Sequence, residues 1–346
     1  MTLVLARLDT VRASLLRFTL SFDFAREVFV SRANRLLVSF LFSCALSFAL
    51  AVVAPVWMIA LAPLLLGIPH LFAGFRYIPK LSGLNGRQWV WFFTAASFGV
   101  SILRLTGVST PIPLSNEWEV LALVLVLGAF SFALPRRVFL SAALLLGVFA
   151  GSWFYPLWTL SILAFAHHFV AFMFWLRSAK SLQERRTVWV SLGIFTAATT
   201  YILAGGVDSI APWMALPSGW GFDPDFLIRG IFPAASQADF VWGGRLISAY
   251  AFGQSLHYFV WLKAIPEQDA LQSVPLSFVQ SGREIQKDLG PGVARAAVAM
   301  SVGLVGMMAW WNLEYLRDLY ISLSTAHGYL ELASLPFLVG MSRARA

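Results

Sequence analysis

The chain has 346 residues, of which 59% are hydrophobic and 12% are charged, and its mean hydropathy of +0.74 excludes an ordinary soluble domain. The net charge of +8 comes without a folded basic domain, which excludes a nucleic-acid partner. The single Cys44 excludes a disulfide framework. We therefore expect an all-α, polytopic integral membrane protein.

Residues 1–35 form an amphipathic segment that we expect at the membrane surface. Apolar side chains at Val4, Leu8 and Val11 recur every three or four residues and alternate with arginines such as Arg7. This spacing is typical of a helix that lies in the plane of the interface. Residues 36–346 are then predicted to form a single transmembrane domain.

Ten apolar runs follow, each long enough to cross a bilayer, which takes roughly 20 helical residues. The predicted spans are 36–54, 56–78, 88–106, 118–134, 138–154, 156–176, 188–206, 240–262, 291–312 and 319–341. Pro55, Pro63 and Pro69 are expected to break up the region of the second span. Between the later spans lie a long outer loop, about 207–239, which we interpret as a lid or entry gate, and a stretch, 264–290, that is expected to hold a short amphipathic helix.

The basic residues test this topology, because Lys and Arg collect in cytoplasmic loops. Of the 25 Lys and Arg residues, 21 precede the first span or follow an even-numbered span. The exceptions are Arg104, Arg229, Arg245 and Arg317. The distribution predicts that both termini are cytoplasmic, and we expect membrane lipids as the surroundings, in a bacterial inner membrane.

All five histidines lie inside these apolar segments: His70, His167, His168, His257 and His327. An ionisable residue inside a membrane indicates a functional site by default, and imidazole is the commonest metal ligand. The histidines fall on spans two, six, eight and ten, which share one direction. Counted from the basic residue at each inner end, His70, His168 and His257 lie about 15, 13 and 9 Å deep, so these three could share one layer.

Glu331 follows His327 by four residues, so both side chains lie on one helix face. A carboxylate at that depth needs a cation, a metal or a proton. We predict metal ligands among all five histidines and Glu331, with His167 as the alternate to His168, since adjacent helical residues point about 100° apart. Glu331, Tyr329 and Arg76 are the candidate catalytic residues.

Three further polar residues lie at helical spacing from the histidines: Gln254, Tyr258 and Tyr77. They are predicted to border the cofactor and to fix imidazole tautomers by hydrogen bonding. Contacts that only pack helices together are the alternative.

The mixed imidazole and carboxylate set favours iron as Fe(II), with a position open for dioxygen. Two alternatives stay open. Two histidines on facing helices could hold a haem b in an electron-transfer protein, or Glu331 and the histidines could form the relay of a proton-coupled transporter. An enzyme would take a hydrophobic small-molecule substrate from the bilayer.

The motif Gly67-Ile68-Pro69-His70 resembles the Gly-Leu/Ile-Pro-His motif of the Brp/Blh-type membrane β-carotene dioxygenases. That family usually continues with Gly and soon an Asp, whereas Leu71 to Gly74 follow here. The resemblance implies a multi-span protein in which intramembrane histidines, His70 among them, hold one ferrous iron. It implies an iron oxygenase that uses dioxygen on a carotenoid- or lipid-like substrate.

Overall fold

The computed structural model describes residues 2–82, 154–210, 240–270 and 275–307, with single positions between 143 and 151 and between 316 and 338. Throughout these described residues the elements are helical and no strand occurs, which confirms the all-α prediction. The predicted spans 88–106 and 118–134, most of 138–154 and most of the loop 207–239 lie outside the described residues.

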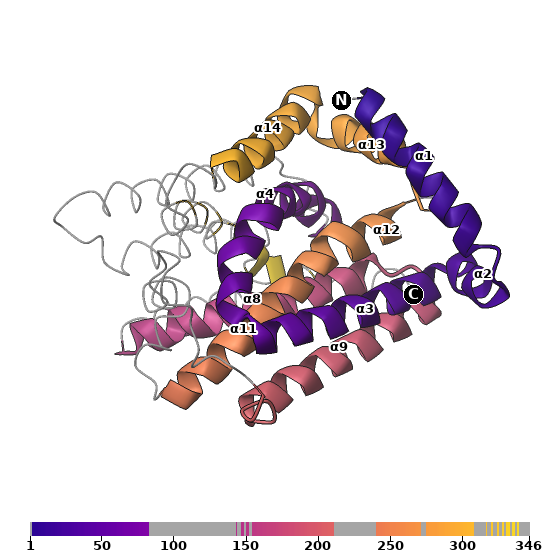
Figure 1. Cartoon of the computed structure of the whole chain (residues 1–346). Coiled ribbons are helices and arrows are strands. Elements are labelled where there is room, and N and C mark those ends of the chain that lie inside the picture. The colour runs from indigo at the N-terminus through magenta and orange to yellow at the C-terminus, as the bar shows by residue number, and fades with distance from the viewer. Residues whose placement is uncertain are drawn as a thin grey trace.

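Five long helices form the bundle that holds the site (Figure 1). They are α3 (Arg32–Val53), α4 (Pro55–Ser82), α8 (Pro156–Ser178), α9 (Leu182–Leu203) and α11 (Phe240–Phe259). Helix α11 contacts all four of the others, and α9 packs along α3. The largest fully buried side chains, Trp175 and Trp261 among them, lie inside this bundle.

Two of the described helices, α3 and α4, are long and apolar enough to cross a membrane. The pair α13 (Phe278–Leu289) and α14 (Pro291–Met307) adds a third if it counts as one broken span, although the two helices are bent by 117°. These helices agree with integration into a membrane. The ten-span arrangement and the cytoplasmic termini stay predictions.

Helix α4 continues for 28 residues through Pro63, Pro69 and Pro79. The prediction that prolines break up this span is therefore wrong, and Pro55 instead begins the helix. Proline is tolerated in a membrane helix when neighbouring helices and local adjustments compensate for the lost hydrogen bonds, and α4 packs against α3, α8, α11 and α14. The unbroken helix keeps Gly67, His70 and Gly74 on one face, because they are three and four residues apart.

Ion pairs gather at one end of the bundle around the short helix α12 (Ile265–Asp269), which follows α11. Arg35 Nε of α3 lies 2.9 Å from Glu267 Oε1, and Lys80 Nζ of α4 lies 2.6 Å from Asp269 Oδ2. Ser178, at the end of α8, also hydrogen-bonds α12. Helices α4, α8 and α11 therefore end on the same side, as the charge pattern predicted.

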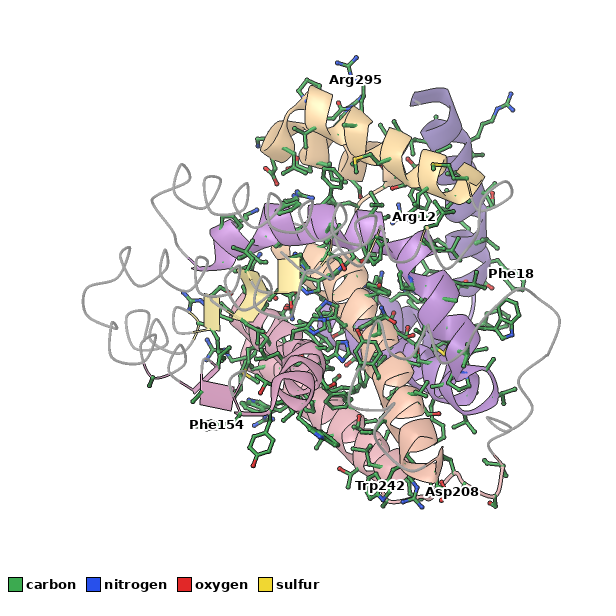
Figure 2. All side chains as sticks on the ribbon, turned by 90° about the vertical axis from the view of Figure 1, so that its left-hand side faces the viewer. Arg12, Phe18, Phe154, Asp208, Trp242 and Arg295 are labelled. Atoms are coloured by element: carbon green, nitrogen blue, oxygen red, sulfur yellow. The ribbon has the colours of Figure 1, made fainter. Side chains whose placement is uncertain are left out.

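The amphipathic segment 1–35 divides into α1 (Thr2–Thr19), α2 (Asp23–Val30) and the start of α3. Helix α1 lies against α13 (Figure 1), which is the amphipathic helix predicted within 264–290. The Asp9 carboxylate accepts hydrogen bonds from the backbone N–H groups of Phe278 (2.7 Å) and Val279 (3.0 Å). Phe18 of α1, 69% exposed, lies at the outer edge of the molecule (Figure 2). The placement of this segment at a membrane surface stays a prediction.

Candidate metal centre

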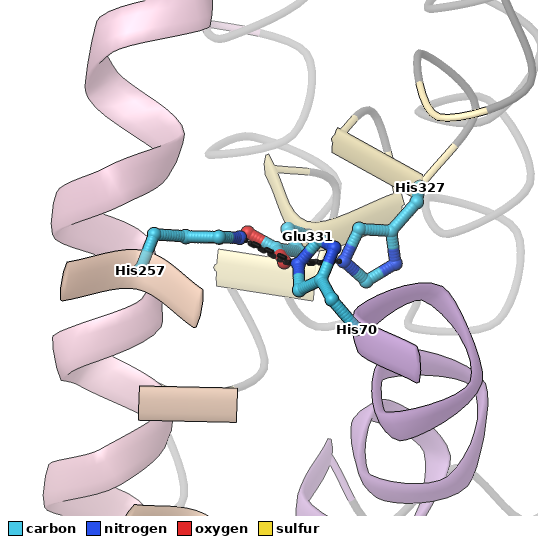
Figure 3. A group of neighbouring side chains, drawn as sticks. All are labelled: His70, His257, His327 and Glu331. Atoms are coloured by element: carbon cyan, nitrogen blue, oxygen red, sulfur yellow. Dashed lines mark hydrogen bonds and ion pairs between the residues drawn. The ribbon is translucent and has the colours of Figure 1, made fainter. Parts of the chain in front are cut away.

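Four side chains from distant parts of the chain meet inside the bundle (Figure 3). His70 comes from α4, His257 comes from α11, and His327 and Glu331 share one helical stretch near the C-terminus. One ligand atom of each lies within 4.8 Å of the others. All four side chains are buried, with relative exposures of 3% or less.

The separations of the donor atoms suit one shared ion. His70 Nε2 lies 2.7 Å from His257 Nε2 and 3.0 Å from His327 Nε2. Glu331 Oε1 lies 2.7 Å from His327 Nε2, 3.4 Å from His257 Nε2 and 3.8 Å from His70 Nε2. With metal–ligand bonds of about 2.1 Å, neighbouring ligands are about 3.0 Å apart in an octahedral arrangement and about 3.4 Å apart in a tetrahedral one.

Hydrogen bonding alone accounts poorly for this cluster. Within the described residues, neither carboxylate oxygen of Glu331 has a hydrogen-bond partner, and Nε2 of His70 lies within 3.0 Å of Nε2 in both of the other imidazoles. Neutral imidazole offers one donor and one acceptor, and a carboxylate only accepts. Burying such groups unsatisfied is costly. A cation among the donors would neutralise the carboxylate and accept the nitrogen lone pairs, so this group could hold a metal ion.

The local sequence and helix geometry explain how the donor side chains are oriented. His327 and Glu331 are one helical turn apart and point to the same place, as predicted from their spacing. Three residues after His257 the α-helix opens into a π-helix, η3 (Val260–Ala264). Short π-helical turns occur often at functional sites. Here the turn carries Trp261, whose ring centroid lies 5.9 Å from that of His327 and 6.5 Å from that of His70.

Two glycines on α4 make room for the C-terminal donors. A Cβ atom on Gly74 would lie 1.9 Å from Cε1 of His327, and a Cβ atom on Gly67 would lie 2.2 Å from the ring of Tyr320. Small residues allow this close approach where helices pack in membranes. The face of α4 that presents His70 is therefore shaped to receive the segment that carries His327.

The polar neighbours predicted from the sequence lie in two places. Tyr258 packs beside the donors, with its ring centroid 5.0 Å from that of His70, and Gln254 Nε2 donates to its hydroxyl oxygen at 3.2 Å. Arg76 instead pairs with Asp288 at 2.6 Å, and its guanidinium lies 4.8 Å from the ring centroid of Tyr77. Tyr329 lies outside the described residues.

The tandem histidines of α8 lie next to the four donors. The ring centroid of His167 is 4.7 Å from that of His257, and the ring centroid of His168 is 5.5 Å from it. The group of four contains a nitrogen of neither residue. A ligand role for His167 or His168 stays a prediction.

The sequence did not predict the roles of three residues near the centre: Trp261, Tyr320 and Gly74, the last of which makes room for His327. A signal for two of them is present in the spacing. Gly67, His70 and Gly74 share one helix face, and Tyr320 precedes His327 by seven residues, the same interval that separates the two glycines. Nothing in the local sequence signals the π-helix that brings in Trp261.

No family model, no curated protein and no solved structure matches this chain. The donor atoms, their burial and the apolar helices that carry them are therefore the basis for a functional conclusion.

Proposed function

We propose that this chain is a membrane-embedded, histidine-ligated non-haem iron oxygenase of a bacterial inner membrane, acting on a lipid-soluble, carotenoid- or lipid-like substrate. The observation that carries the proposal is the convergence of three imidazole Nε2 atoms and one carboxylate in a fully buried place. Histidine and carboxylate ligands with coordination positions left open are the arrangement that non-haem Fe(II) oxygenases use.

The spacing favours a single ion over a haem. The axial nitrogens of a haem lie on opposite sides of the iron, so they are about two metal–nitrogen bonds, or about 4 Å, apart, with the macrocycle between them. His70 Nε2 is only 2.7 Å from His257 Nε2 and 3.0 Å from His327 Nε2. A haem held between any of these pairs would require the helices to separate.

Iron held by these four donors would supply a binding position for dioxygen and the redox chemistry of oxygenation. The chain itself fixes the donors on packed helices and keeps water away from them. Trp261, Phe75 and Tyr258 surround the imidazoles with aromatic rings, at centroid distances of 5.9 and 6.3 Å from His327 and 5.0 Å from His70. A site so enclosed by apolar helices suits a substrate that arrives from the lipid phase.

Metal analysis of the detergent-purified protein tests the proposal. We expect about one iron per chain and an absorption spectrum without a Soret band. His257→Ala and Glu331→Gln should each remove most of the iron. Ser248→Ala, which changes another fully buried polar side chain of α11, should retain it. A haem spectrum, a protein free of metal after iron supplementation, or variants with undiminished iron would refute the proposal.

The substrate class needs a separate experiment. Membranes that contain the protein are incubated with β-carotene under ¹⁸O₂, and the products are analysed by mass spectrometry. Incorporation of ¹⁸O that is lost in Glu331→Gln supports an oxygenase acting on polyenes. Iron binding without products from β-carotene would refute the carotenoid assignment and leave the metal centre in place.

A further inference from the structure

His168 is a buried polar side chain that the four-donor group leaves unexplained. It lies in the middle of α8 and its relative exposure is 0%. Neither of its ring nitrogens has a hydrogen-bond partner among the residues that the structure describes. A buried imidazole with no partner is costly, so its position favours a bound ligand as the partner.

The surroundings of His168 place this ligand beside the metal centre. Its ring centroid lies 5.5 Å from that of His257, whose Nε2 is one of the four donors. Three further rings lie around it, those of His167 at 4.3 Å, Tyr250 at 5.1 Å and Phe165 at 5.8 Å. Because these rings lie so near, a ligand at His168 could have only a few atoms.

Gly253 of α11 lies against one of the two ring nitrogens of His168. A Cβ atom on Gly253 would lie 2.6 Å from Nδ1 of His168, so this nitrogen is pressed against the backbone of α11. Within a helix the backbone N–H groups already donate to carbonyls one turn earlier, so Gly253 presents only its C–H groups there. A bare nitrogen tolerates such a contact better than an N–H group does. The proton is therefore assigned to Nε2, on the other side of the ring.

We propose that Nε2 of His168 donates a hydrogen bond to a small anionic or polar molecule, of the size of dioxygen, that is seated next to the metal centre. His168 is then a binding residue and not a metal ligand. The inference rests on the proposed function, because it requires a metal among the four donors. It adds a contact for the second reactant, since a donor aimed at a small oxygen- or nitrogen-containing molecule stabilises negative charge on it.

Cobalt and azide provide a test that does not depend on turnover. The purified protein is loaded with Co²⁺, whose visible spectrum responds to the number of ligands, and azide is titrated as a linear anion of three atoms. Three variants are compared with the wild type: His168→Leu, His168→Gln and Ser161→Ala. Glutamine keeps an N–H near the position of Nε2, and Ser161 is a fully buried residue of the same helix, seven residues away.

We expect His168→Leu to bind Co²⁺ with the wild-type stoichiometry and spectrum but to bind azide about 10- to 100-fold more weakly, as expected when a hydrogen bond to a charged group is lost. His168→Gln should recover most of the affinity, and Ser161→Ala should match the wild type. Unchanged azide affinity in His168→Leu would overturn the inference and indicate a structural water next to the ring. A changed Co²⁺ spectrum or lost Co²⁺ would overturn it in favour of a ligand role. Failure of the wild type to take up any metal would instead overturn the proposed function, and this inference with it.

Discussion

Replacing Gly74 by alanine should disable the metal centre without removing a donor. The new Cβ atom would lie 1.9 Å from Cε1 of His327, whereas ordinary contacts begin at 3.4 Å. The ring or the helix must therefore move by about 1.5 Å. Metal sites tolerate deviations of only about 0.2 Å in bond length, so His327 cannot stay in place. We expect the metal affinity to fall by at least about 10- to 100-fold, the loss seen when residues that orient a ligand are changed.

The assay is a competition titration of the purified protein with a chromophoric chelator, using Zn²⁺ or Co²⁺. Gly193→Ala is the matched control, because a Cβ atom on this glycine of α9 would meet nothing within 4 Å. It should bind metal normally, and it should be as stable as the wild type or more stable, since alanine is the better helix former. Wild-type metal affinity in Gly74→Ala would show that the packing of α4 against the segment of His327 does not position this ligand.

Three further predictions concern stability. Glu267→Gln removes the carboxylate that pairs with the guanidinium of Arg35, which is 5% exposed, and should lower the free energy of unfolding by about 3 kcal/mol; an unchanged thermal midpoint in detergent would contradict this. At the opposite end of the bundle (Figure 2), the hydrogen bond from Arg245 holds the pKa of Asp208 below its usual value of 3.8. The pair should therefore stabilise the fold above about pH 4 and lose this contribution as the pH falls through the lowered pKa, so the difference in thermal midpoint between wild type and Asp208→Asn should shrink only in acid. Finally, a strong chelator should lower the thermal midpoint of the metal-loaded wild type but not that of Glu331→Gln, because metal that binds only the native state stabilises it; equal shifts in both would count against the centre.

The parts of the site that follow from helix periodicity could be predicted from the sequence. The spacing of His327 and Glu331 places both on one face of any regular helix, and the structure has them 2.7 Å apart. The shared direction of α4, α8 and α11 could be predicted from the basic residues at their ends, because such charges are expected on one side of a membrane. Both conclusions depend only on which residues stand at which positions of the chain.

The rotation of each helix about its own axis could not be predicted in the same way. This rotation determines which histidine of α8 lies next to which side chain of the neighbouring helices. It depends on the packing between α8 and α11, where Gly253 lies against His168. The estimate of depth placed His70 and His257 in one layer but gave no reliable position for His327, because the last predicted span lacks a sharp basic residue at its inner end. The prediction that prolines interrupt α4 was wrong for a similar reason. Whether a proline breaks a helix depends on its tertiary contacts, which a rule based on the local sequence does not include.

Half of the donors at this centre come from residues 327 and 331, whereas the other two lie much earlier in the chain, at positions 70 and 257. Ribosomes make the chain from its N-terminus, so a nascent protein can present His70 and His257 to one another long before the remaining pair exists. If these donors hold an ion, its binding site is complete only after the segment that carries residues 327 and 331 has packed against α4. Under the proposed function, this order would act as a checkpoint, because only molecules with that segment in place would acquire reactive chemistry.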